Sequence, residues 1–156
     1  MSCMATFDIG TTAVKAVLVD EAGRAVFSCS KDIPTIFEGD RKEQDPRVWW
    51  DAFCEISRSF VRQGFEIAGI VMSGQMQDVI PVDEQLQAVG NAILYSDGRG
   101  EEQAERIRAK LGADKLAQIT GNDFNGTLSL PKICWLKEHQ PEVDRRARYY
   151  LISSKD

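Results

Sequence analysis

The chain has 156 residues, of which 43% are hydrophobic and 28% charged, and its formal net charge is −5. This length fits one domain, and no apolar run approaches the roughly 20 residues that span a bilayer. The N-terminus has no basic region followed by an apolar stretch, so we expect neither a secretory signal nor a membrane segment. Because the basic residues are scattered in an acidic chain, we expect no nucleic-acid partner. The cysteines lie far apart without a CxxC pair, which argues against zinc and favours a reducing compartment, the cytoplasm.

The first part of the chain predicts three strands. Residues 4–9 form a short apolar run, and residues 13–20 are β-branched and nearly all apolar, as in a strand covered on both faces. A turn at residues 21–23 leads to an alternating third strand at 24–30. The short connections predict an antiparallel meander. The mixed polar residues 32–44 predict a loop.

A helix start follows at Asp45 and Pro46. The aspartate can accept a hydrogen bond from the first-turn amides, and proline fits the first helical position. Gly64 fits the stop of this helix. The spacing of the large apolar residues predicts one buried face, and we expect both neighbouring tryptophans in the core. These positions are Trp49, Trp50, Phe53, Ile56 and Phe60.

The remaining chain alternates strand and helix patterns. Extended segments are expected at 66–74, which is predicted to be buried, and at 78–83, 91–97 and 147–153; helices are expected at 99–111, with Leu111 facing inward, at 113–119, and from Pro131 onward. The β-β-β-α-β order, followed by further strands and helices, predicts an α/β domain with a mixed sheet. The single histidine, His139, lies near a helix C-terminus, where a cation is favourable, and we expect no catalytic role for it.

Polar side chains gather at the turn between the first two strands, in the stretch "DIGTTAVK". Gly10 permits close approach of a ligand, and backbone amides at so tight a turn favour an anion such as phosphate. Thr11 and Thr12 can donate to phosphate oxygens, and Lys15 adds positive charge. Asp8 repels phosphate but can hold magnesium, which bridges to phosphates. The alternative is a turn in which these side chains cap backbone amides.

Two further strand ends are polar, "SGQMQD" at 73–78 and "YSDGRG" at 95–100. Ligands of open α/β sheets gather beyond strand ends, so these segments are candidates for one pocket. Gln75, Gln77, Asp97 and Arg99 offer donors and acceptors for a polyhydroxylated ligand. The alternative is ordinary loop residues, with Arg99 paired to Asp97 or Glu102.

Five motifs in order along the chain resemble the FGGY carbohydrate kinases, within the superfamily of sugar kinases, actin and heat-shock chaperones. They are "DIGTTAVKAVLVDEAGR", "EQDPRVWWDAF", "IAGIVMSGQMQ", "AILYSDGRG" and "ITGNDFNGTLSLPKICWLKEHQPEV". The "EQDP", "GQM" and "DGR" segments are similar to the xylulokinase-like subgroup. The resemblance implies a ribonuclease-H-like (actin-like ATPase) fold and transfer of the γ-phosphoryl of ATP, with magnesium, to a sugar or polyol hydroxyl.

The same resemblance implies roles residue by residue. Asp8 would position magnesium, through water, and the transferring phosphate, and the residues that follow would form the phosphate turn. Lys15 and Arg99 match the motifs without a role that the resemblance defines. The implied phosphate-turn residues are Gly10, Thr11 and Thr12, and the implied sugar-site residues are Gln75, Met76, Gln77, Tyr95 and Asp97.

Two positions depart from the xylulokinase pattern. Gln77 stands where those enzymes usually have histidine, and Tyr95 where they usually have tryptophan. Glutamine and histidine can both hydrogen-bond a sugar hydroxyl, but only histidine titrates near neutral pH. A pentulose such as xylulose is favoured, and another ketose or a polyol stays open.

The chain is about a third as long as members of this family. The resemblance implies that residues 1–156 are part of an N-terminal kinase domain, and that the general base and the second, ATP-clamping domain lie outside the chain. We therefore expect the 156-residue piece to be catalytically silent, and an exposed sheet edge would favour a homodimer. The competing hypothesis is a non-catalytic module of the same superfamily. A nucleic-acid-processing enzyme of ribonuclease-H type is disfavoured by the acidic balance.

Overall fold

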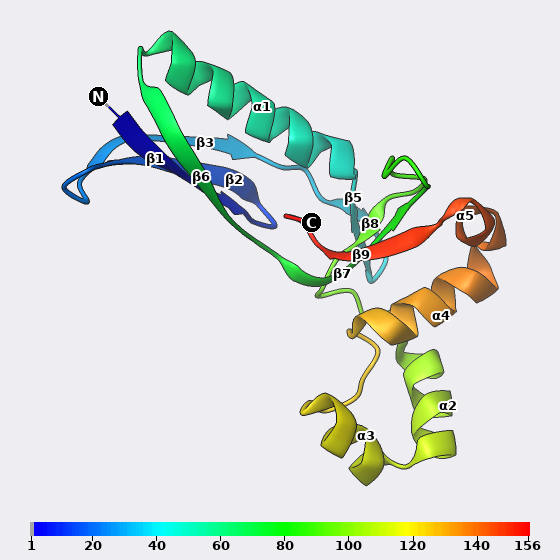
Figure 1. The fold of residues 1–156 in the computed structure, drawn as a ribbon. Coiled ribbons are helices and arrows are strands. Elements are labelled where there is room, and N and C mark those ends of the chain that lie inside the picture. Colours follow the sequence, from blue (N-terminus) through cyan, green and yellow to red (C-terminus); the bar gives the residue numbers. More distant parts are fainter. Residues whose placement is uncertain (1) are drawn as a thin grey trace. The chain divides into compact units, whose positions relative to one another are not determined.

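The computed structural model describes residues 2–156, which form two compact units (Figure 1). The first unit contains residues 2–35, 45–75 and 154–156. The second unit contains residues 36–44 and 76–153. Each unit has a sheet of its own, and each is described separately below.

The first unit is built on a four-stranded mixed sheet with the order β3-β2-β1-β6. Strands β1 (Ser2–Ile9), β2 (Ala13–Asp20) and β3 (Ala25–Asp32) pair antiparallel, while β6 (Glu66–Gly74) runs parallel to β1. This arrangement confirms the predicted meander and the mixed sheet. Continuous apolar residues in β2 face both sides of the sheet, so the strand is buried over most of its length.

Helix α1 (Pro46–Arg62) covers one face of this sheet, as Figure 1 shows. The Asp45 carboxylate accepts a hydrogen bond from the Arg47 amide, as predicted, and Gly64 follows the helix with a φ of 80°. Trp49 is buried, but Trp50 is 65% exposed, so its predicted core position is wrong. Consecutive residues of a helix point about 100° apart, and only one of two adjacent tryptophans faces the sheet.

Strand β6 differs from its prediction in burial but not in length. Ile70 is 51% exposed and Val71 is 56% exposed, although a buried strand was predicted. The strand lies at the edge of its sheet in the described residues, and α1 packs over β2 and β3. An edge position therefore leaves both faces of an apolar strand partly uncovered.

The second unit contains an antiparallel sheet with the order β4-β5-β8-β7-β9. Its strands are β4 (Ile36–Glu38), β5 (Arg41–Gln44), β7 (Met76–Val82), β8 (Ala92–Ile93) and β9 (Tyr149–Ser153). The loop predicted at 32–44 is wrong, since β3 extends to Asp32 and residues 36–44 form the β4–β5 hairpin around Gly39. The sequence does not predict this hairpin, because its residues are mostly charged and show no apolar alternation. Backbone pairing between β4 and β5 holds it. The extended segment predicted at 91–97 shortens to β8.

Four helices pack with this sheet or with one another: α2 (Glu101–Leu111), α3 (Ala113–Thr120), α4 (Ser129–His139) and α5 (Pro141–Arg146). Trp135 and Leu136 of α4 join a core cluster with Val79 and Ile93. Leu111 is 47% exposed, which contradicts its predicted inward position at the last turn of α2. Helix α4 begins two residues before Pro131, and α5 was not predicted because its charged residues carry no apolar period.

Candidate functional site

The predicted phosphate turn between β1 and β2 is tight and held by backbone bonds. The Gly10 amide donates to the Ala13 carbonyl at 3.1 Å, and the Ile33 amide donates to the Thr12 carbonyl at 2.8 Å. A Cβ added to Gly10 would lie 3.1 Å from the Ala13 oxygen, so a side chain there would force the turn to shift. Thr11 is half-buried and Thr12 is exposed. The turn thus keeps its shape without using the Thr12 side chain, which is available to a ligand.

Asp8 and Lys15 lie opposite each other at the end of this strand pair. Both side chains are exposed, and Ser73 of β6 neighbours Asp8 in the parallel register. Partners in register point to the same face of a sheet, so a carboxylate, an ammonium group and a hydroxyl are presented together. This set offers a ligand for a cation and a donor for an anion on one surface.

Gln75 is bonded to the β1–β2 turn within the first unit. Its amide donates to Ser154 Oγ at 3.0 Å, and Ser154 Oγ donates to the Ile9 carbonyl at 2.9 Å. Its side-chain Nε2 reaches the Gly10 carbonyl at 3.5 Å. A Cβ on Gly74 would lie 2.5 Å from Ser154 Oγ, so this close approach requires glycine. Sequence reasoning missed Ser154, because no pattern marks a serine that bonds a backbone 145 residues away.

In the second unit, three predicted sugar-site residues present their side chains at the surface. Met76 is 71% exposed, Tyr95 is 45% exposed, and Gln77 is exposed with a φ of 63°. A left-handed backbone at a residue other than glycine or asparagine is uncommon and costs about 1–2 kcal/mol. Such strain persists only where the surrounding structure holds it, and it is most frequent at functional sites.

Asp97 and Arg99 are buried together rather than exposed. Arg99 donates to both Asp97 oxygens at 2.9 and 2.7 Å and to Glu43 at 2.7 Å. The Lys42 amide adds a 2.7 Å bond to Asp97. Burial would raise the pKa of Asp97, but the bonds from Arg99 and from the Lys42 amide outweigh it and hold that pKa below its usual range. Asp97 is thus a saturated carboxylate, and Arg99 pairs with Asp97, one of its two predicted partners, and with Glu43, not with Glu102.

The Trp135 ring packs against the Arg99 guanidinium of this ion pair. The guanidinium groups of Arg99 and Arg41 lie 4.7 and 5.0 Å from the centre of the Trp135 ring, and His139 stacks on the ring at 4.6 Å. These contacts explain why α4 carries a tryptophan one turn before a histidine at its C-terminus. They also give His139 a packing role.

Two further buried charges lie beside these residues, and sequence reasoning assigned neither of them. Lys132 is fully buried and donates to the carbonyls of Leu94 at 2.7 Å and Gln77 at 3.0 Å. Asp78 is also fully buried and accepts a 2.9 Å bond from the Tyr95 amide. Burial raises the pKa of Asp78 to about 6 and lowers the pKa of Lys132 to about 8. The sequence did contain one signal for a buried lysine, since Lys132 lies among apolar residues of a helix, three positions before Trp135.

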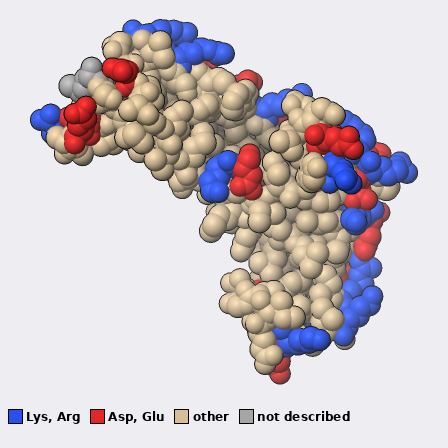
Figure 2. Space-filling model, in the orientation of Figure 1, with Lys and Arg blue, Asp and Glu red and all other residues tan. Residues whose placement is uncertain are grey.

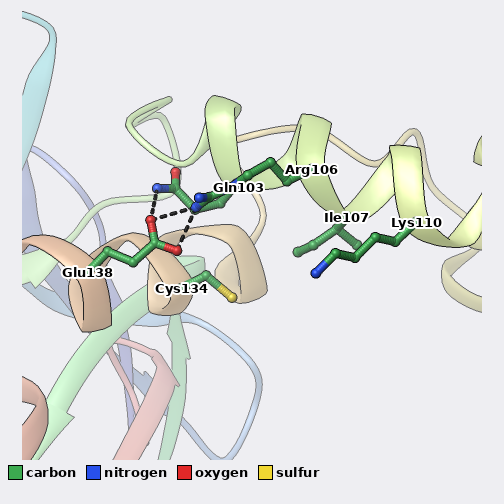
Figure 3. A pocket seen from close by; sticks show the side chains of 6 residues that line it. All are labelled: Gln103, Arg106, Ile107, Lys110, Cys134 and Glu138. Atoms are coloured by element: carbon green, nitrogen blue, oxygen red, sulfur yellow. Dashed lines mark hydrogen bonds and ion pairs between the residues drawn. The ribbon is translucent and has the colours of Figure 1, made fainter.

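A pocket of about 240 Å³ lies elsewhere in the second unit, between α2 and α4 (Figure 3). Figure 3 shows Gln103 and Arg106 of α2 facing Glu138 of α4, with bonds of 2.9 and 2.5 Å. None of the predicted site residues lines this pocket. Glu138 is satisfied by Gln103 and Arg106, while the buried Oε1 of Gln103 has no hydrogen-bond partner among the described residues.

The described residues show no ready-made metal cage and no membrane span. Among residues 2–156, no group of three or more His, Cys, Asp or Glu side chains is placed to hold a metal ion, and no helix is long and apolar enough to cross a bilayer. Magnesium commonly keeps several waters and binds one or two carboxylates plus substrate phosphates, so a single exposed carboxylate such as Asp8 fits it. Figure 2 shows basic side chains interspersed with acidic ones on the face it presents.

The mixed sheet and the helices form an α/β arrangement that solved sugar kinases of the actin-like ATPase fold share. The crystal structure of xylulose kinase from Rhodospirillum rubrum superposes with a TM-score of 0.89 at 25% identity, over 99% of this chain and 32% of that one. Residues 3–155 match the model for the N-terminal domain of the FGGY family of carbohydrate kinases. The chain belongs to this family, which confirms both the predicted family and the predicted fold.

Further relatives agree on the family and differ in the substrates that their names carry. Xylulose kinase from Bacillus subtilis (strain 168) is 37% identical over 150 residues, which are 93% of this chain and 30% of that protein. Gluconate kinase from Lactobacillus acidophilus superposes with a TM-score of 0.87 at 29% identity, over 96% of this chain and 31% of that one. The chain spans about 30% of the length of the curated relatives it matches.

Proposed function

We propose that this chain supplies the phosphate turn and the sugar-contact segments of an ATP-dependent kinase that phosphorylates a hydroxyl of a sugar or polyol. The observation that carries the proposal is the tight β1–β2 turn, where exposed Asp8 lies opposite exposed Lys15 in a chain of the FGGY family. A pentulose such as xylulose is the favoured substrate, since several relatives are named xylulose kinases.

The residues of the first unit fit a nucleotide phosphate and magnesium. Gly10 carries no side chain, which would permit close approach of a phosphate, and Thr11 and Thr12 would donate to phosphate oxygens. Asp8 would hold magnesium through water, and Lys15 would offset phosphate charge. Bound magnesium and ATP would supply the phosphoryl group and the neutralisation of its charge, which is most of what phosphoryl transfer requires.

The predicted sugar-site residues of the second unit divide into contacting and bracing side chains. Met76, Gln77 and Tyr95 are exposed and would contact the sugar. Asp97 and Arg99 are saturated by each other and by Glu43, so we propose that they shape the segment that carries Tyr95. Gln75 belongs to the first unit, where its side-chain Nε2 reaches the Gly10 carbonyl.

We further propose that the chain is part of an N-terminal kinase domain and that a second, ATP-clamping domain carries the rest of the nucleotide site. A general base contributes about 10²–10⁴-fold to rate, so the 156-residue chain alone would be catalytically silent. The four cysteines form no disulfide within residues 2–156, which supports a cytoplasmic location. The partly uncovered β6 edge supports self-association of the chain.

The decisive experiment is a phosphorylation screen of the full-length parent protein with pentuloses, hexuloses, polyols and gluconate, with ADP release as the readout. We expect the highest kcat/KM with a pentulose. If a substrate of another class gives the highest kcat/KM, the proposed pentulose is wrong but the proposed kinase activity stands. Sugar binding by calorimetry without ADP release would overturn the kinase proposal and favour a non-catalytic binding module.

A further inference from the structure

Lys132 is a lysine with no exposed surface, in a chain whose other lysines all reach the solvent. Its ammonium group donates to two backbone carbonyls, those of Leu94 and Gln77, at 2.7 and 3.0 Å. We propose that Lys132 is a positioning residue for the sugar site, which it sets by anchoring the backbone of both sugar-contact segments. This inference rests on the proposed function for the identity of the ligand.

The two anchored carbonyls belong to the segments whose side chains are exposed for contact. Gln77 is itself a predicted contact residue, and its strained φ of 63° needs a partner that holds it. The Leu94 carbonyl directly precedes Tyr95 and also accepts the Asp97 amide at 3.0 Å, which closes the turn. One ammonium group therefore fixes two chain segments 17 residues apart relative to each other.

Asp78 provides a second, buried contact to the segment that carries Tyr95. Its Oδ1 accepts the Tyr95 amide at 2.9 Å, and its buried Oδ2 has no hydrogen-bond partner among the described residues. Asp78 and Asp97 attract the Lys132 ammonium and Arg99 repels it, while burial disfavours its charge. Because Arg99 and backbone amides occupy the Asp97 oxygens, the bonds of the ammonium group go to backbone carbonyls.

A packing role alone would not select this residue. Taking a charge out of water is costly, and an apolar side chain at this position would avoid that desolvation cost. Helix α4 carries apolar neighbours at Pro131 and Trp135, so methionine would fill the same space. What methionine cannot do is donate to the two carbonyls. The lysine therefore serves to fix the backbone geometry of the two contact segments.

The test compares Lys132→Met with Lys137→Met, a matched change at an exposed lysine of the same helix, in the full-length parent. We expect Lys132→Met to raise the sugar KM about tenfold, as the loss of charge-assisted hydrogen bonds predicts, with the ATP KM changed less than about twofold. Hydrogen exchange should rise about tenfold or more at residues 76–79 and 94–97 and stay unchanged in α1 and β1. Lys137→Met should change none of these quantities.

Each outcome decides a separate statement. Unchanged exchange at both segments, or an equal rise of the sugar and ATP KM values, would overturn the positioning role. Absence of sugar phosphorylation by the wild-type parent would overturn the proposed function, while the exchange data would still decide the anchor. If Lys132→Met does not fold, NMR of the wild-type lysine ammonium groups replaces it. Couplings from Lys132 Nζ to the Leu94 and Gln77 carbonyls support the anchor, and a rapidly exchanging ammonium contradicts it.

Discussion

The two units present their predicted functional residues in opposite ways. In the first unit, Asp8 and Lys15 are exposed on a turn that backbone bonds hold without them. In the second unit, Asp97 and the Arg99 side chain are buried and bonded to each other, while Tyr95, two residues before Asp97, is exposed. Polar residues that follow strands are thus exposed in one unit and form a buried ion pair in the other.

Because of this difference, substitutions at exposed and at buried residues should affect stability and activity differently. A side chain that the fold does not use can change without unfolding the chain, so its loss should appear in the kinetics alone. A buried, saturated ion pair cannot lose one member without leaving a charge unpaired in the interior. Substitutions of the buried pair in the second unit should therefore change stability and activity together, and substitutions of exposed Asp8 or Lys15 should change activity only.

Arg99→Met tests the buried side of the comparison and carries the largest expected effect. It leaves Asp97 and Glu43 without their cation, and we expect the free energy of unfolding to fall by about 3–5 kcal/mol. Urea denaturation of the 156-residue chain measures this change. Arg106→Met is the matched control, because its ion pair with Glu138 is half-exposed and screened by solvent, so its loss should change stability far less. Equal losses in both variants would contradict a special role for the buried pair.

Asp8→Asn tests the exposed side. We expect kcat of the full-length parent to fall about 10²–10³-fold, the range found when one electrostatic contact to a developing charge is removed. The free energy of unfolding should change by less than about 0.5 kcal/mol, because the side chain is exposed. Asp51→Asn, an exposed change on α1, is the control for both measurements. Unchanged turnover in Asp8→Asn would show that its magnesium and phosphate role is wrong.

Sequence patterns predicted the fold where backbone and side-chain signals agree. The β1–β2–β3 meander and α1, from Asp45 to Gly64, follow from β-branched runs, a capping aspartate and a stop glycine. The hairpin at 36–44 and helix α5 escaped because charged residues form them without an apolar period. Exposure of β6 escaped because strand position in a sheet is a tertiary property that the strand's own residues do not record.

The candidate site was predictable only at its surface. The motifs named Gln77, Tyr95 and Asp97, but they carry no information on which carboxylate is saturated or which lysine is buried. Lys132 and Glu43 contact residues more than 35 positions away, and such partners depend on how the sheet of the second unit pairs. Buried partners such as Lys132 and Glu43 therefore need the structure, whereas Gln77 and Tyr95 were proposed as contacts from the sequence and stay predictions.

Asp78→Asn sharpens the comparison through pH. Burial raises the pKa of Asp78 from 3.8 to about 6, so the folded chain binds this proton more tightly than the unfolded chain does. The contribution of Asp78 to stability therefore falls as the pH rises from about 4 to about 6 and is constant above that range. Asparagine does not titrate, so the stability of Asp78→Asn relative to wild type should rise by up to about 3 kcal/mol across this window. Urea denaturation at pH 4, 5, 6 and 7 measures it, and a difference that does not depend on pH would contradict a buried, titrating Asp78.

Gln77→Gly separates the strain of a left-handed residue from the loss of a contacting side chain. Glycine adopts a φ of 63° without strain but has more freedom in the unfolded chain, so the gain in stability should be at most about 1 kcal/mol. Leu86 has a φ of 59° in an exposed turn away from the predicted site residues, and Leu86→Gly is the matched control. Both variants should change stability by similar amounts, while only Gln77→Gly should raise the sugar KM of the parent, by about tenfold for a lost polar contact. Both changes replace a left-handed residue by glycine, but only Gln77 has a side chain that a sugar would touch. A KM that rises equally in both variants would therefore show that backbone flexibility, and not a lost contact, causes the effect.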